Sequence, residues 1–133
     1  MKRITESRRR GDLGEVAAAR YLRHRLYRIL DRNWFFHKKE IDIVARRGNT
    51  LAICEVKTRT RNPDSPSPYG TAASAVDAEK QRNLSVAARA YIRAIGWRGN
   101  VRMDVIEVYL DKKNEKGALK VSRIIHIRNA FPA

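Results

Sequence analysis

The chain has 133 residues, which is enough for one domain with a hydrophobic core. Hydrophobic residues make up 43% and charged residues 32%, which excludes a disordered chain, and no apolar run approaches the ~18 to 20 residues of a membrane span. We therefore expect a single domain over residues 1–133, with a basic segment at 1–10 that could be flexible, and no membrane partner.

Cysteine content and the N-terminal residues bear on the cellular compartment. Cys54 is the only cysteine, which excludes an internal disulfide and a cysteine-rich zinc site. The first residues are basic but lack the apolar run of a secretory signal. A cytoplasmic location is the resulting expectation.

The strongest global signal is the net charge of +15. Twenty of the 29 cationic residues are arginine, whose planar guanidinium matches the geometry of phosphate oxygens. These charges are spread along the chain, which favours a basic folded surface over a basic tail. The composition predicts a nucleic-acid partner; a ribosome-associated or generally basic protein is the alternative.

Hydrophobic periodicity predicts two helices and five strands. In chain order these are a helix over 8–26, strands over 27–36, 39–46 and 51–58, a proline-rich loop over 59–70, a helix over 71–95, and strands over 101–110 and 119–127 around a polar turn at 112–117. The order α-β-β-β-α-β-β predicts an α/β protein with a mixed β-sheet flanked by helices. The helix between the third and fourth strands predicts that these two strands are parallel and joined by a right-handed crossover.

One hairpin brings charged residues together. If Gly48-Asn49 is a two-residue loop, Asp42 lies opposite Glu55, and Glu40 lies opposite Lys57. A four-residue loop would keep the same four residues on one face, whereas a three-residue loop would separate them. Directly opposed side chains have Cβ atoms ~4.5–5.5 Å apart, so the two-residue loop predicts two adjacent carboxylates.

Adjacent carboxylates repel each other, and burial increases the repulsion. A divalent cation such as Mg²⁺ or Mn²⁺ offsets it, because such ions take one or two carboxylates and keep positions open for water and phosphate. A lysine beside the ion holds or polarises an attacking water. The pattern Asp42…Glu55-x-Lys57 therefore predicts a metal site for phosphodiester hydrolysis. The alternative is a surface ion pair of Glu55 and Lys57 beside a solvated Asp42.

These residues resemble the motif of the PD-(D/E)-x-K nuclease superfamily. More narrowly, the chain resembles the YraN family of uncharacterised bacterial proteins, which is similar to archaeal Holliday-junction resolvases. The matching positions follow in order over roughly residues 11–108: Gly11-x-x-Gly14-Glu15-x-x-Ala18-x-x-Tyr21-Leu22, Arg32-Asn33, Glu40-Ile41-Asp42-Ile43-Val44-Ala45, Glu55-Val56-Lys57-Thr58-Arg59, Val76, Lys80, Leu84, Ala87-Ala88, Tyr91-Ile92 and Val101-Arg102-Met103-Asp104-Val105.

The resemblance implies a restriction-endonuclease-like fold and roles for the matching positions. Asp42 and Glu55 would be metal ligands, and the backbone carbonyl of Val56 would complete the set. Lys57 would be the catalytic lysine.

Two further acids belong to the same motifs. Glu15, on the first helix, would be the additional acid that resolvase-like folds bring to the site. Glu40 would be a partner of Lys57 outside the metal ligands, as the register above suggests.

Basic residues close to the predicted site are candidates for nucleic-acid contacts. Arg59 and Arg61 follow it directly, at the start of the proline-rich loop, and are expected to contact the substrate backbone. Lys80, on the second predicted helix, could approach phosphate or be solvated. Resolvase-like relatives act as dimers, so the resemblance also implies a homodimer.

The sequence thus predicts a nuclease that depends on Mg²⁺ or Mn²⁺ and hydrolyses DNA. Branched or damaged DNA is one candidate substrate, and the sequence leaves the shape of the substrate open. The first alternative is a non-catalytic nucleic-acid-binding domain with the same fold. The complete set of acids and lysine argues against it, because clustered carboxylates repel phosphate. A third hypothesis, a basic interaction protein, predicts no metal binding at Asp42 and Glu55.

Overall fold

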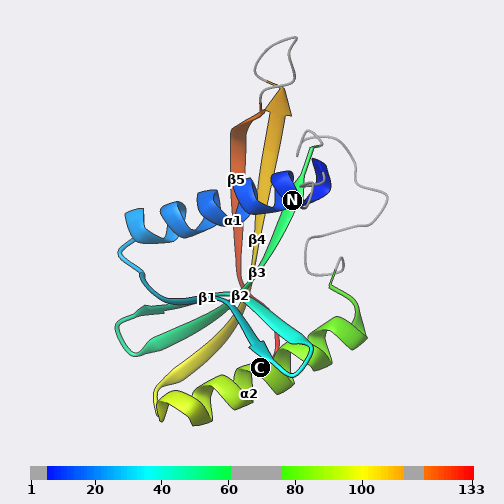
Figure 1. Ribbon diagram of the computed structural model, residues 1–133. Coiled ribbons are helices and arrows are strands. Elements are labelled where there is room, and N and C mark those ends of the chain that lie inside the picture. The colour runs from blue at the N-terminus through cyan, green and yellow to red at the C-terminus, as the bar shows by residue number, and fades with distance from the viewer. Residues whose placement is uncertain (1–5, 61–75, 113–118) are drawn as a thin grey trace, which may run out of the picture.

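The computed structural model describes residues 6–60, 76–112 and 119–133, and its elements have the predicted order (Figure 1). They are α1 (Glu6–His24), β1 (Arg28–Phe36), β2 (Lys39–Arg47), β3 (Thr50–Arg59), α2 (Ala78–Ile95), β4 (Asn100–Lys112) and β5 (Leu119–Phe131). The sheet lies between α1 and α2. The expected α/β fold with a mixed sheet flanked by helices is confirmed.

The strands follow one another across the sheet in the order β1-β2-β3-β4-β5. β3 and β4 are parallel, as the intervening helix predicted, and the other three neighbouring pairs are antiparallel. The last strand, β5, lies at one edge of the sheet. Within the described ranges, neither α1 nor α2 combines the length and hydropathy that crossing a membrane requires.

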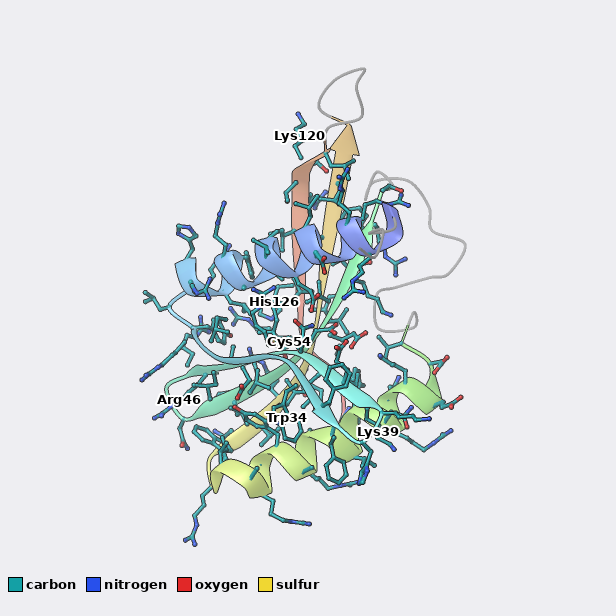
Figure 2. The ribbon with its side chains drawn as sticks, in the orientation of Figure 1. Trp34, Lys39, Arg46, Cys54, Lys120 and His126 are labelled. Atoms are coloured by element: carbon teal, nitrogen blue, oxygen red, sulfur yellow. The ribbon has the colours of Figure 1, made fainter. Side chains whose placement is uncertain are left out.

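Side-chain alternation divides the core between the two faces of the sheet. Along β3, Leu51 and Ile53 pack in the cluster that includes α2, whereas Ala52 and Cys54 pack in the cluster that includes α1. Cys54 is fully buried against α1 near the middle of the sheet, while Trp34 lies toward α2 (Figure 2). Burial also raises the pKa of the Cys54 thiol, which argues against a role as a nucleophile.

The β2–β3 hairpin has the two-residue loop that the sequence predicted. Arg47 pairs with Thr50, and the same register continues to Ile43 and Cys54. Gly48 takes a positive φ of 59°, which glycine adopts without steric cost.

The start of α2 differs from the prediction. A helix over 71–95 was expected, but α2 begins at Ala78, because Asp77 is extended and its carboxylate accepts a 2.8 Å hydrogen bond from the N–H of Lys80. This is an N-cap, a role that aspartate favours. The end at Gly96 is as predicted, with Gly96 at φ 68°. Residues 71–75, most of the loop expected at 59–70, residues 1–5 of the basic segment and most of the turn at 112–117 lie outside the described residues.

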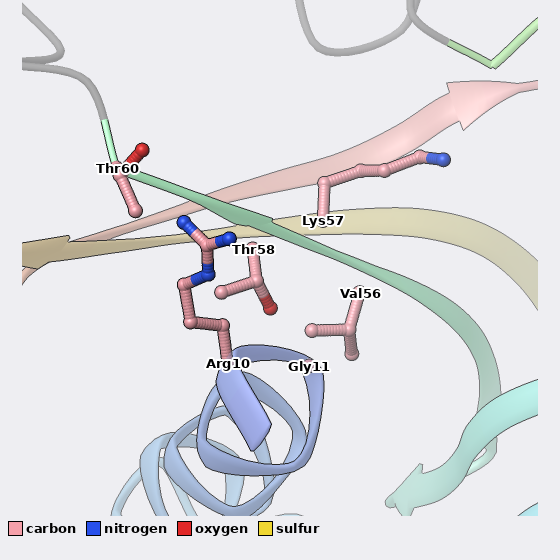
Figure 3. A pocket seen from close by; sticks show the side chains of 6 residues that line it. All are labelled: Arg10, Gly11, Val56, Lys57, Thr58 and Thr60. Atoms are coloured by element: carbon pink, nitrogen blue, oxygen red, sulfur yellow. The ribbon is translucent and has the colours of Figure 1, made fainter. Parts of the chain in front are cut away.

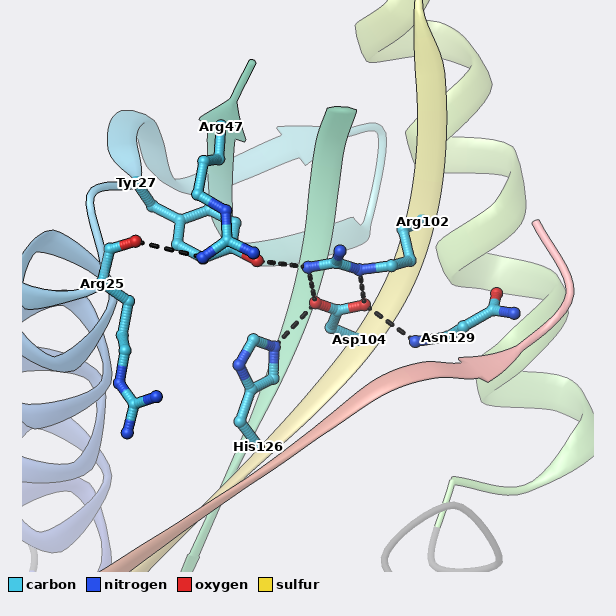
Figure 4. A network of polar contacts seen from close by, with 7 residues as sticks. All are labelled: Arg25, Tyr27, Arg47, Arg102, Asp104, His126 and Asn129. Atoms are coloured by element: carbon cyan, nitrogen blue, oxygen red, sulfur yellow. Dashed lines mark hydrogen bonds and ion pairs between the residues drawn. The ribbon is translucent and has the colours of Figure 1, made fainter. Parts of the chain in front are cut away.

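A buried polar network joins β4 to β5 and to Tyr27, in the segment between α1 and β1 (Figure 4). The fully buried carboxylate of Asp104 accepts two 2.8 Å hydrogen bonds from Arg102 and lies 2.7 Å from Nε2 of His126. Arg102 also donates to the hydroxyl of Tyr27, which follows α1. Although burial alone would raise the pKa of Asp104, bonds from His126, Arg102 and the N–H of Asn129 together lower it. The pair of Arg102 and Asp104 is thus a structural contact inside the sheet.

α1 crosses β3 very closely at Gly14. A Cβ atom on Gly14 would clash with Oγ1 of Thr58, whereas one on Gly11 would meet no atom of the described residues within 4 Å. Gly14 therefore lets the helix approach β3, which places Glu15, the next residue of α1, beside the sheet.

We expect Gly14→Ala to lower the free energy of unfolding by ~1–3 kcal/mol, because the added methyl forces helix and strand apart. Gly11→Ala is the matched control. It should raise the free energy of unfolding by ~0.5–1 kcal/mol through helix propensity alone. Urea unfolding of both variants measures the two effects. Equal effects of the two substitutions would contradict the close crossing.

Candidate active site

The site lies where the β2–β3 ladder ends. Backbone pairing stops at Ile43 and Cys54, and one step further Oδ2 of Asp42 accepts a 2.8 Å hydrogen bond from the N–H of Val56. A side chain thus replaces the main-chain acceptor of β2. In an extended strand the N–H and C=O of one residue point toward the same neighbouring strand. The carbonyl of Val56 therefore also points toward β2, at the place where the ladder has ended.

Asp42 lies among other carboxylates. Burial raises its pKa to about 8, helped by the charges of Glu55, Glu15 and Glu40 and opposed by the Val56 hydrogen bond. The repulsion between Asp42 and Glu55 agrees with the proximity that the hairpin register predicted, although the backbone ladder ends one step earlier, at Ile43 and Cys54. The ladder ends before Glu40 and Lys57, so their predicted backbone pairing is not formed.

Glu55 is 5% exposed and meets two lysines from different elements. Its Oε1 lies 3.6 Å from Nζ of Lys57 on β3 and 3.5 Å from Nζ of Lys80 on α2. Its Oε2 is buried and has no hydrogen-bond partner within the described ranges of the chain. A buried carboxylate oxygen without a partner is costly, so this atom is a candidate ligand for a cation.

α1 adds Glu15 to the cluster. Its Oε1 accepts a 2.6 Å hydrogen bond from the amide of Asn33 on β1. Burial and the charges of Glu40 and Asp12 raise the pKa of Glu15, while Asn33 and Arg32 oppose the rise. Glu15 and Glu40 therefore lie near Asp42. Glu15 is bound to β1 through Asn33, and in the described structure the ion pair of Lys57 is with Glu55 and not with the predicted partner Glu40.

The donor set suits a hard divalent cation of the Mg²⁺ type. Among residues 6–60, 76–112 and 119–133, no three His, Cys, Asp or Glu side chains are grouped so that they could ligate one ion alone. Two carboxylates, Asp42 and Glu55, together with the Val56 carbonyl and water are a set that Mg²⁺ accepts, because it keeps several waters. The Oε2 of Glu55, which has no partner in the part of the chain that the structure describes, and the raised pKa of Asp42 both mark an excess of negative potential that an ion would remove.

A polar cavity lies on the other side of β3, against α1. Its volume is about 430 Å³, and its lining residues are Arg10, Gly11, Val56, Lys57, Thr58 and Thr60. Arg10 reaches from α1 toward Thr58 and Thr60, while the side chain of Lys57 points to the opposite side of the strand (Figure 3). A guanidinium beside two hydroxyls is suited to phosphate oxygens.

Comparison with known proteins agrees with the motifs. The family model described as "Uncharacterised protein family UPF0102" matches residues 14–108. The chain belongs to this family. It is 41% identical over 128 residues to a UPF0102 protein of Symbiobacterium thermophilum, with 96% of this chain and 99% of that protein covered. It is 42% identical over 122 residues to one of Geobacter sulfurreducens, with 91% and 87% covered. The resemblance to an uncharacterised bacterial family is confirmed.

The three residues predicted to contact nucleic acid have different places in this UPF0102 protein. Nε of Arg59 donates a 2.8 Å hydrogen bond to the buried Glu107, so part of its guanidinium has a structural partner. Arg61 lies outside the described residues. Lys80 reaches Glu55 and therefore belongs to the carboxylate site.

Two features of the site go beyond what the sequence pattern predicted. Asn33 stands out in the sequence only as part of a motif, although asparagine inside a strand is unusual enough to mark it. The contact of Lys80 with Glu55 depends on where α2 begins. The N-cap pattern, in which Asp77 precedes Lys80 by three residues, was the signal that could have placed Lys80 in the first turn.

Replacing Asp42 by asparagine tests its electrostatic environment. Asp42→Asn removes the charge and keeps an oxygen that accepts from Val56. A carboxyl whose pKa rises on folding from 3.8 to about 8 stabilises the fold below pH 3.8, and this stabilisation is lost as the pH approaches 8. Without metal, we therefore expect Asp42→Asn to become progressively more stable than the wild type between pH 4 and 8, by at most ~1.4 kcal/mol per pH unit.

Urea unfolding at pH 5 and pH 8 measures this difference. Asp111→Asn, which neutralises an exposed acid on β4, is the control and should show no such trend. A stability difference for Asp42→Asn that is equal at the two pH values would contradict the assigned environment.

Proposed function

We propose that this UPF0102 protein is a nuclease that depends on Mg²⁺ or Mn²⁺ and hydrolyses phosphodiester bonds of DNA. One observation carries the proposal. The fold holds Asp42 and Glu55 together despite their repulsion, with lysines at the same carboxylate, in a chain of net charge +15. This arrangement costs stability unless a cation is bound, which supports a functional reason for it.

The roles follow from the contacts. Asp42 and Glu55 would hold the ion with the carbonyl of Val56, and a bound Mg²⁺ would supply Lewis-acid activation of water and phosphate. Lys57, whose side chain is 30% exposed, can reach solvent while it stays beside Glu55. Its ammonium would hold the attacking water or stabilise the developing negative charge on the phosphate.

Lys80 supports the same assignment from the other side of Glu55. Its ammonium is 3.5 Å from Oε1, the oxygen that Lys57 also approaches, so Oε2 is left for the ion. With the charge of Glu55 neutralised, Lys57 and Lys80 would be available to an incoming phosphate. Glu15 would be the additional acid, positioned to orient water at the edge of the site.

The surroundings of the site suit a polyanionic substrate. The cavity at Arg10, Thr58 and Thr60 adjoins Lys57 and could take a neighbouring phosphate. A net charge of +15 raises the association rate with nucleic acid through long-range attraction.

Cutting both strands of branched DNA requires two such sites. The homodimer stays a prediction that rests on the resemblance.

A cleavage panel tests the proposal. Labelled single-stranded, duplex, flap and four-way-junction DNA would be incubated with Mg²⁺ or Mn²⁺ and with wild type, Asp42→Asn, Lys57→Met or Asp111→Asn. We expect cleavage that needs the metal, that falls by ~100-fold or more in Asp42→Asn and Lys57→Met, and that Asp111→Asn leaves intact. Calorimetry with Mg²⁺ should show binding to the wild type and Lys57→Met but not to Asp42→Asn.

The panel also separates the alternatives. Nucleic-acid binding and Mg²⁺ binding without cleavage in all four proteins would favour the non-catalytic domain. Absence of Mg²⁺ binding in the wild type would contradict the proposed function and favour the basic interaction protein.

A further inference from the structure

Asn33 adopts a left-handed backbone in the middle of β1. Its φ is 51°, although the residues on both sides remain paired with β2: Arg32 with Ile43 and Trp34 with Ile41. The same register continues through the position, so Asn33 stands opposite Asp42. Asparagine is one of the few residues other than glycine that tolerate this conformation.

In both strands of the β1–β2 hairpin, the regular alternation of side chains between the two faces of the sheet is broken at this point. In β1, Asp31 accepts from the hydroxyl of Tyr91 on α2, and Trp34 packs edge-on against the same ring at 5.1 Å. Residues three apart in a regular strand point to opposite faces, so the alternation is broken between Asp31 and Trp34.

β2 breaks its alternation at the matching position. Ile41 packs in the cluster of α2 and Ile43 in the cluster of α1, although residues two apart in a regular strand share a face. Figure 1 shows the two strands bending together in mid-strand. Asp42 stands between the two isoleucines, at the bend, where its carboxylate reaches the N–H of Val56 on β3.

The side chain of Asn33 acts on a second acid. Its amide Nδ2 donates the 2.6 Å hydrogen bond to Oε1 of Glu15 on α1. Glycine would supply the backbone conformation without the amide, and glutamine would supply an amide without the left-handed preference. Asparagine supplies both.

We propose that Asn33 is the positioning residue of the candidate site, turning Asp42 toward Val56 through its left-handed backbone and orienting Glu15 through its amide. We call the effect of the left-handed backbone on Asp42 the backbone half of the proposal, and the effect of the amide on Glu15 the amide half. The catalytic consequence rests on the proposed function, whereas the backbone half can be tested without it. The two halves are separable by substitution, because Asn33→Gly keeps the conformation and removes the amide, and Asn33→Ala removes both.

Hydrogen exchange at the amide of Val56, followed by NMR without metal, tests the backbone half. The proposal predicts wild-type protection in Asn33→Gly and at least ~10-fold faster exchange in Asn33→Ala, because the bond to Asp42 is weakened.

Asn129→Gly is the matched control, since Asn129 also has a left-handed φ of 52° in a strand. Asn129 contacts Asp104 through its backbone N–H, which glycine keeps. Asn33→Ser replaces the alanine variant if that variant does not fold. Equal protection in the glycine and alanine variants would overturn the backbone half.

A double-mutant cycle in the cleavage assay tests the amide half. Asn33→Gly should lower the Mg²⁺-dependent rate by ~10-fold in the wild-type background and have no further effect in Glu15→Ala, because the amide acts through Glu15. Additive effects of the two substitutions would overturn it. A wild type that does not cleave would defeat the proposed function and the amide half together, while exchange at Val56 would still decide the backbone half.

Discussion

The fold of this protein holds two carboxylates, Asp42 and Glu55, closer together than their charges favour. The repulsion helps burial to raise the pKa of Asp42 to about 8, and one oxygen of Glu55 is buried without a partner among the residues that the structure describes. Packing on both faces of the sheet imposes this arrangement, because β3 is buried between α1 and α2 over the preceding residues. Local interactions reduce the electrostatic cost of holding the two carboxylates together but do not remove it. The Val56 N–H donates a hydrogen bond to Asp42, and two ammonium groups approach Glu55.

Each layer of the structure contributes one part of the site. The β2–β3 hairpin supplies the register, and the bend at Asn33 and Asp42 ends the ladder so that a side chain can take the place of a main-chain acceptor. The close crossing at Gly14 brings Glu15 from one face. The N-cap of α2 puts Lys80 in the first turn, on the other face. The buried Asp104 network joins β4 to β5. The carboxylate site lies in the other half of the sheet.

The sequence predicted the parts of this account that depend on short-range patterns. Alternation and turn chemistry were enough for the order of the elements along the chain, the two-residue loop at Gly48 and the expectation that Asp42 and Glu55 lie close together. Extending the hairpin register to Glu40 and Lys57 failed because the bend at Asn33 interrupts it. A backbone conformation at one asparagine is not encoded in periodicity, which assumes a regular strand. The contacts of Lys80 with Glu55 and of Arg59 with Glu107 join elements far apart in sequence, so their partners emerged only from the packed structure.

The central claim is that Asp42, Glu55 and the Val56 carbonyl form a divalent-metal site. Its most direct test is a crystal structure of the protein grown with Mn²⁺, with anomalous difference density measured for the wild type and for Asp42→Asn. The account predicts one Mn²⁺ peak between the two carboxylates, within coordination distance of Oε2 of Glu55 and of the Val56 carbonyl, and no peak there in Asp42→Asn. Wild-type crystals without density at this position, with Lys57 or Lys80 filling it instead, would contradict the claim.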